Sequence, residues 1–94
     1  MTDLAELAPE HFDPLIGDRF AVNGSDGVLQ LLSVERLKSP SPRTQPFSLI
    51  FTSTTHRLTQ ATFRLTHPAL GEIDVFLVPL QPDARGPIYE AVFN

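Results

Sequence analysis

Six short segments of the chain alternate between apolar and polar side chains, and turn-forming residues separate them. A period of two places successive side chains on opposite faces, so each segment predicts a strand with one buried face. The segments are residues 19–22, 28–37, 47–52, 60–66, 72–80 and 88–94. Their connections are too short for crossover helices, so neighbouring strands should pair antiparallel. The pattern predicts an all-β fold with a minor α part: a small six-stranded antiparallel β-barrel or sandwich with one short N-terminal helix.

The length of 94 residues predicts a single domain, residues 1–94, with one modest core. Six of its seven phenylalanines fall in the predicted strands, so the core should be rich in phenylalanine. The chain has no cysteine, which excludes disulfides and thiolate chemistry. Residues 23–27 read NGSDG, a strong signal for a hairpin turn.

One short helix is predicted over residues 9–17. Phe12, Leu15 and Ile16 are spaced i, i+3, i+4 and predict one apolar stripe along it. We expect this helix to cover an open end of the β-barrel or sandwich, which should occupy residues 18–94.

The strand predicted over residues 28–37 departs from simple alternation. Leu29 and Leu31 would lie on one face, and Leu32 and Val34 on the other. Apolar residues on both faces predict that this strand bends or is covered on both sides.

Residues 38–46 form a loop rich in serine and proline. Such a composition favours an extended surface connection. A docking segment for a partner is the alternative, because proline-rich segments lose little entropy on binding.

The chain ends on the sequence IYEAVFN, residues 88–94. Tyr89, Ala91 and Phe93 share one face, and Ile88 and its alternate neighbours share the other. We therefore predict that this segment is a strand that completes or closes the barrel. Its deletion should leave an insoluble or unfolded chain, because a neighbouring strand would lose its partner.

The charge and hydropathy of the chain bound its partners. A net charge of −4 without a basic stripe argues against binding to nucleic acid. No apolar run approaches the roughly 18 residues that span a membrane, so no membrane partner is expected. The first residues are acidic and resemble no secretory signal, which predicts a cytoplasmic protein, or one exported without a cleaved signal peptide.

The three histidines, His11, His56 and His67, lack the spacing of a metal site. We expect His67 to cap a turn and the other two to lie at the surface. No nucleophile motif or phosphate-binding loop occurs. The sequence therefore predicts no catalytic residue, no cofactor and no metal, and a protein that is not an enzyme.

Glu72 and Asp74 would share one face of a strand, with Arg64 on the partner strand of the hairpin. A carboxylate pair can serve acid–base catalysis when burial raises one pKa. A cross-strand ion pair with Arg64 is the simpler interpretation.

The strand over residues 72–80 has apolar side chains on both faces. Phe76, Val78 and Leu80 share one face with Asp74. The opposite face carries the residues expected in the core, Ile73, Val75 and Leu77. An apolar stripe on an outer face predicts a protein-interaction site, made here of Phe76, Val78, Leu80 and Asp74. The alternative is that the N-terminal helix covers the stripe.

Four stretches of the chain, EHFDPLIGDRF, PFSLIF, RLTHPALGEIDVFLVPL and YEAVFN, resemble a family of small single-domain bacterial proteins of unknown function that end in a YEAVFN-type strand. The resemblance spans residues 9–94. It implies a stand-alone domain with no assigned activity. It also implies an accessory or structural role near phage-tail-collar-like fibre proteins.

These observations favour a non-enzymatic protein-interaction or structural module of a bacterial assembly. Its partner would be another protein, or a second copy of the chain through self-association. The alternative is a small-ligand-binding β-barrel with a pocket at the barrel mouth under the helix. An enzyme that uses Asp74 or His67 ranks third.

Overall fold

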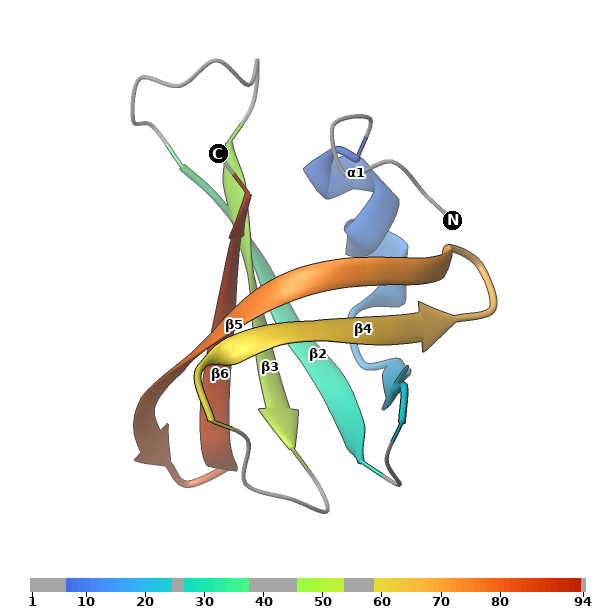
Figure 1. Cartoon of the computed structure of the whole chain (residues 1–94). Coiled ribbons are helices and arrows are strands. Elements are labelled where there is room, and N and C mark those ends of the chain that lie inside the picture. The colour runs from blue at the N-terminus through green and yellow to red at the C-terminus, as the bar shows by residue number, and fades with distance from the viewer. Residues whose placement is uncertain (1–6, 25–26, 38–45, 54–58, 94) are drawn as a thin grey trace.

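The computed structural model describes residues 7–24, 27–37, 46–53 and 59–93. Two helical turns precede six strands, which run antiparallel to their neighbours and form one closed barrel (Figure 1). The elements are α1 (Pro9–Phe12), the 3-10 turn η2 (Asp13–Leu15), β1 (Arg19–Val22), β2 (Val28–Arg36), β3 (Phe47–Ser53), β4 (Ala61–His67), β5 (Gly71–Asp83) and β6 (Gly86–Phe93). The predicted all-β class with a minor α element is confirmed, and the sheet closes as a barrel.

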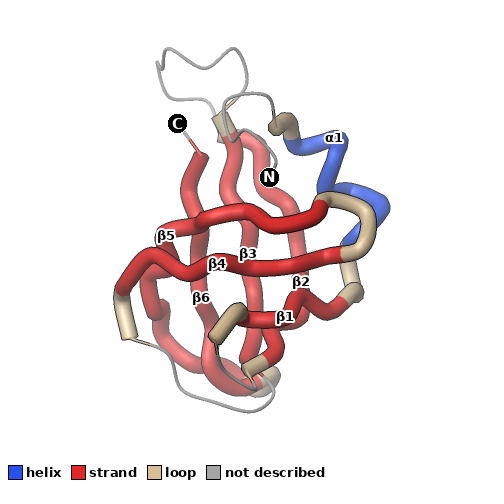
Figure 2. Tube along the Cα trace, turned by 45° about the vertical axis from the view of Figure 1, so that its right-hand side comes forward, coloured by secondary structure: helices blue, strands red, loops and turns tan. Residues whose placement is uncertain are grey.

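The barrel is built from two three-stranded meanders, β1–β2–β3 and β4–β5–β6, which meet at two seams. Strands β4 and β5 cross in front of β2, β3 and β6 at a steep angle (Figure 2). The first seam joins β3 to β6 through six consecutive residue pairs, from Phe47↔Phe93 to Thr52↔Ile88. The second seam joins β1 to β4 at Ala21↔Thr66 and Val22↔Leu65. The terminal strand therefore completes the wall, between β3 and β5, and the short β1 closes it.

The inward faces of the strands fill the barrel with aliphatic and aromatic side chains. The predicted inward residues of β3 and β6 are buried in this cluster, which confirms the alternation in both strands. Those residues are Phe47, Leu49 and Phe51, and Tyr89, Ala91 and Phe93. Side chains that fill so narrow a barrel exclude water and stabilise it through buried apolar area.

Helix α1 covers the barrel end where β3 begins and β6 ends. Phe12 is fully buried there, with its ring centroid 5.8 Å from that of Phe47 and 5.9 Å from that of Phe93. The rings of Phe47 and Phe93 stack at 4.6 Å with an interplanar angle of 4°. The expectation that the helix covers an open end is confirmed.

The predicted helical stripe is wrong at Ile16. Phe12 and Leu15 are buried, but 47% of Ile16 is exposed. The helical geometry ends with η2, and Ile16 is extended at φ −60°, ψ 129°. The i+4 spacing therefore no longer applies at this position.

Strand β2 carries a bulge that explains its apolar residues on both faces. Leu31 pairs with Phe51 on β3, but Ser33 pairs with the next residue, Ile50, so Leu32 is an extra residue. The extra residue reverses the alternation. Val34 consequently packs against the core on the same side as Leu31, and its predicted place on the opposite face is wrong.

Strand β5 extends beyond its predicted end at residue 80. It pairs with β4 through Leu77 and with β6 from Leu77 onward, so it changes partners at this buried residue. The hairpin continues through Asp83↔Gly86, which confines the turn to residues 84–85. Thr52 of β3 supports this turn, because its hydroxyl donates a hydrogen bond to the Pro87 carbonyl at 2.7 Å.

Candidate functional site

The outward side chains of β5, β6 and β3 form one apolar surface, the outer apolar face, composed of Phe76, Val78, Leu80, Ile88, Val92 and Ile50. Register brings them together: Leu80 pairs with Ile88 and Val78 with Glu90, and Glu90 pairs with Ile50. Their neighbours in sequence, such as Leu77 and Ala91, point into the core.

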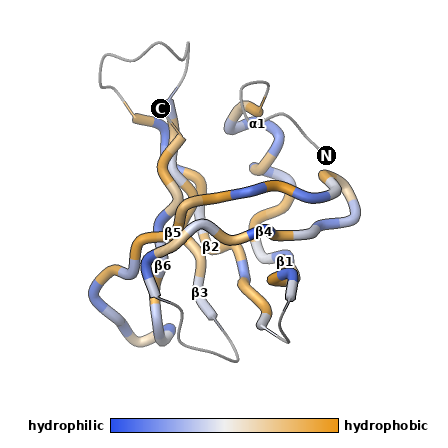
Figure 3. The backbone as a smooth tube through the Cα atoms, viewed as in Figure 1, coloured by the Kyte–Doolittle hydropathy of each residue, from blue (hydrophilic) through white to orange (hydrophobic). Residues whose placement is uncertain are grey.

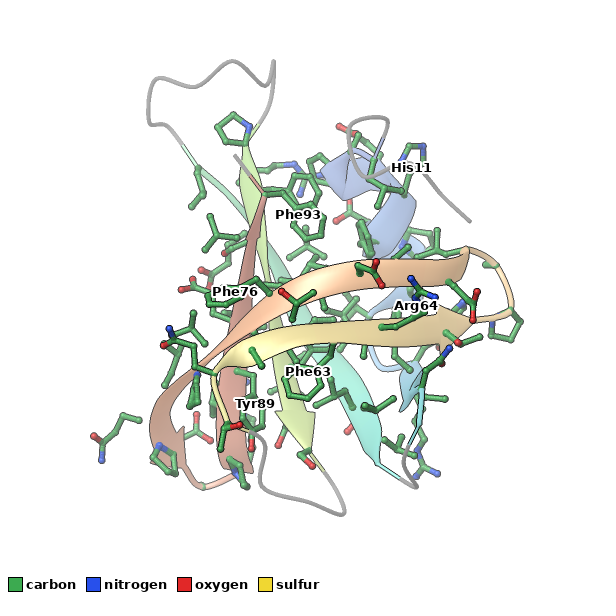
Figure 4. The ribbon with its side chains drawn as sticks, in the orientation of Figure 1. His11, Phe63, Arg64, Phe76, Tyr89 and Phe93 are labelled. Atoms are coloured by element: carbon green, nitrogen blue, oxygen red, sulfur yellow. The ribbon has the colours of Figure 1, made fainter. Side chains whose placement is uncertain are left out.

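Three side chains of this face are open to solvent. The exposed fractions are 50% for Phe76, 46% for Val92 and 39% for Leu80. Ile50 and Ile88 of this face are buried, and neither belongs to the core cluster. Phe76 points away from the barrel on the outer side of β5 (Figure 4).

The alternative in which the N-terminal helix covers this stripe is wrong. Helix α1 and η2 pack against β2, and Arg36 of β2 holds Asp13 of η2 in an ion pair of 2.6 Å. The amide of Gly17 donates to the carbonyl of Leu31 at 2.7 Å, which fixes the following chain on the same strand. The helical segment thus packs on β2 and over the barrel end, and Phe76, Leu80 and Val92 remain exposed.

Asp74 lies at the polar end of the same face and has an internal partner. Its Oδ1 accepts a hydrogen bond from Arg64 Nε at 2.9 Å, and its Oδ2 lies 3.3 Å from Arg64 Nη2. The two residues are direct cross-strand partners. The hydrogen bond from Arg64 lowers the pKa of Asp74 from its ordinary value of 3.8, so the carboxyl is ionised at neutral pH. The predicted cross-strand ion pair is confirmed.

A second polar network lies beside this pair and joins the turn after β1 to β4 and β5. The Asn23 side-chain amide donates to Glu72 Oε2 at 2.7 Å, and the Thr66 hydroxyl donates to Asn23 Oδ1. The outward residues of β5 therefore change from polar at Glu72 and Asp74 to apolar at Phe76 and Val78, and Figure 3 colours each residue along this strand by its hydropathy. The sequence indicates Asn23 only as a turn residue, because its partners come from strands far along the chain.

His67 uses both ring nitrogens inside the fold. Its Nδ1 accepts the Ala69 N–H at 3.0 Å, and its Nε2 lies 2.9 Å from Asp18 Oδ2. Because an amide can only donate, Nδ1 carries no proton and Nε2–H donates to Asp18. The ring also lies on Phe20, with centroids 4.8 Å apart. The prediction that His67 caps a turn is confirmed, and neither nitrogen is left for a substrate.

His11 is exposed and its Nδ1 accepts the Ala8 N–H at 2.9 Å, which caps the start of α1. His56 lies outside the described residues. Within the ranges that the structure describes, no three His, Asp or Glu residues gather closely enough to hold a metal ion.

A family model described as Domain of unknown function (DUF6916) matches residues 7–93. The chain belongs to this DUF6916 family. The match extends from Leu7, the first described core residue, to Phe93, the last residue of β6, so it includes the barrel and the helical segment that covers it. No curated protein and no solved structure matches the chain. None of the helices in the described ranges has the length and apolar character needed to cross a membrane.

The interior of this DUF6916 barrel bears on the ligand-binding alternative. The mouth under the helix is occupied by Phe12, Phe47 and Phe93 in ring contact. Deeper in the barrel, Phe51 meets Phe20 edge-on, with centroids 5.5 Å apart. A ligand at this mouth would have to displace packed aromatic rings.

The sequence-based site lacked three residues of the outer apolar face of this DUF6916 chain, Ile50, Ile88 and Val92, and also Glu90, which lies among them. Alternation alone places Ile88, Glu90 and Val92 on the outward side of the last strand. Their position beside Phe76 and Val78 depends on the β5–β6 register, which determines which residues of the two strands lie opposite each other. Alternation within a single strand carries no information about that register.

Proposed function

We propose that this DUF6916 protein is a non-enzymatic protein-interaction or structural module that binds a protein partner through the outer apolar face. The observation that supports this most directly is the exposure of Phe76, Leu80 and Val92 on one continuous sheet surface. Contiguous exposed apolar surface beside a polar rim is typical of protein interfaces. Here the rim is supplied by the Arg64–Asp74 pair.

The face is better suited to binding than a strand edge. Beyond Leu77, β5 pairs with β6 but, within the described residues, no longer with β4 or another strand, so its other side is an edge there. Pro79 and Pro82 lie in this stretch, and proline has no N–H to offer an added strand. Prolines on an edge protect it from strand addition.

The proposal includes a bacterial setting. Resemblance to small bacterial proteins with a YEAVFN-type ending suggests an accessory role in a bacterial assembly, such as one containing phage-tail-collar-like fibre proteins. The partner would then be a component of that assembly. This part of the proposal rests on sequence resemblance alone.

Capture experiments with matched variants test the proposal. Tagged wild-type protein should retain a specific partner from lysate of the source cells, and Phe76→Ser should lose it. The substitution should leave the free energy of unfolding within about 0.5 kcal/mol of wild type, because Phe76 points outward. Captured proteins are identified by mass spectrometry, and stability is measured by urea denaturation.

The control is Ile16→Ser, which removes an apolar side chain of nearly equal exposure at the end of η2, outside the outer apolar face. It should leave capture unchanged. A partner that is retained equally by wild type, Phe76→Ser and Ile16→Ser would contradict the proposed role of the face.

A further inference from the structure

Glu90 lies in the middle of the outer apolar face. It pairs across the sheet with Val78 of β5 on one side and with Ile50 of β3 on the other. Its side chain is half-buried, and no described residue forms a hydrogen bond or an ion pair with it. A carboxylate in such surroundings is stable only while water still reaches it.

Most of the other described carboxylates have partners within the chain. Ion pairs or hydrogen bonds within the chain engage Asp13, Asp18, Glu72, Asp74 and Asp83. Glu35 and Glu10 resemble Glu90, because no described residue forms a hydrogen bond or an ion pair with either of them. Glu35 is the cross-strand partner of Ser48, whose hydroxyl is buried without a hydrogen-bond partner. Glu90 and Glu35 thus lie on either side of β3, on the same outward surface, whereas Glu10 lies on α1.

A partner that covers Val78, Val92 and Phe76 also covers Glu90, because Glu90 lies between them. Removing water from an unpaired carboxylate is strongly unfavourable, so the partner must bring a positive charge to this point. Phe76 occupies the position diagonal to Glu90 across the β5–β6 pair, within reach of a long side chain. A guanidinium that binds the Glu90 carboxylate can therefore also lie on the Phe76 ring.

A second copy of the chain fits this surface poorly. A symmetric contact would place the same face against itself. That face offers Glu90 and Glu35, and Arg64 at its edge already holds Asp74. Two such faces would bring carboxylates together without a described free cation between them.

We propose that the outer apolar face binds a polypeptide segment of another protein in which an arginine or lysine is flanked by apolar side chains. The cation pairs with Glu90, and the apolar neighbours cover Phe76, Leu80 and Val92. This inference rests on the proposed function, since it specifies the chemistry of the partner at the same surface.

Selection from a phage-displayed library of random short peptides on the immobilised full chain tests the inference. Enriched peptides should carry a basic residue between apolar residues. Binding of the synthetic peptides is then measured by fluorescence polarisation. Glu90→Gln should weaken binding by about tenfold or more, because a charge-assisted hydrogen bond is lost. Added salt should weaken binding to wild type more than to Glu90→Gln.

Glu10→Gln is the matched control, because it removes an exposed glutamate from α1 with the same change in charge. It should leave peptide affinity unchanged. Enriched peptides without a basic residue, or equal binding to wild type and Glu90→Gln, would overturn the inference, as would a selection that enriches nothing. If Phe76→Ser still abolishes capture of the partner from lysate in any of these cases, the proposed function stands; if it does not, both fail. Self-association in sedimentation that is lost in Phe76→Ser would assign the face to a second copy and overturn the inference.

Discussion

At the scale of single residues, the buried side chain of His67 has a hydrogen-bond partner for each ring nitrogen within the fold. Its two nitrogens bind the Ala69 amide and the Asp18 carboxylate, and its ring packs on Phe20. His67→Phe keeps an aromatic ring at the site but leaves the Ala69 amide unpaired. We expect a loss of about 2 kcal/mol in the free energy of unfolding, measured by urea denaturation.

Asp18→Asn is the control for this substitution. The side-chain oxygen of the asparagine can still accept a hydrogen bond from His67 Nε2, so this variant should keep most of the free energy of unfolding. An unchanged free energy of unfolding in His67→Phe would mean that the two hydrogen bonds do not stabilise the fold.

The Arg64–Asp74 pair predicts a pH dependence of stability. The pKa of Asp74 is lower in the folded chain than its ordinary value of 3.8, because Arg64 donates a hydrogen bond to the ionised form. The unfolded chain therefore takes up the proton first as the pH falls. The stabilisation is complete above the ordinary pKa and is lost as the pH falls through the lowered folded value. The free energy of unfolding of wild type should thus decrease more steeply below about pH 4 than that of Asp74→Asn.

This difference is measured by urea denaturation across the acid range. Arg85 lowers the pKa of Asp83 in the same direction, so Asp83→Asn should reduce the slope in its own right. Parallel curves for wild type and Asp74→Asn would contradict the assigned contribution of the ion pair.

At the scale of elements, strand β6 contributes to the core and to two neighbours. Deletion of residues 88–94 would remove Tyr89, Ala91 and Phe93 from the core and leave β3 and β5 without their shared partner. We expect insoluble or unfolded protein, checked by solubility and by circular dichroism melting. A soluble truncated chain that melts cooperatively would contradict this role of β6.

Most elements could be predicted because local signals determine them. The alternation Phe47, Leu49, Phe51 fixes the inward face of β3 without reference to any other strand. The bulge at Leu32 could not be predicted, since the extra residue exists only relative to the β3 register. The extension of β5 to Asp83 could not be predicted for a related reason. The prolines in residues 79–82 indicate a turn locally, but this segment pairs with β6 and remains a strand.

At the scale of the whole molecule, the candidate site was predicted only in part. Phe76, Val78 and Leu80 could be placed on an outward face because Ile73, Val75 and Leu77 alternate with them into the core. Whether the helix covers that face depends on the packing of α1 against β2, which no local pattern encodes. The pairing of β3 with β6 was equally inaccessible, because it joins segments about 40 residues apart in the chain, whereas the β5–β6 hairpin follows from pairing of sequence neighbours.

The position of β6 within the wall is the claim on which the binding surface depends, because it brings Val92 and Glu90 beside Phe76. Amide hydrogen exchange followed by NMR on the full chain, without a partner, tests it directly. Amides of β6 that pair with β3 should exchange as slowly as those of Phe47–Ser53, since both open only with the core. Exchange across residues 88–93 as rapid as that of an unstructured peptide would contradict the account.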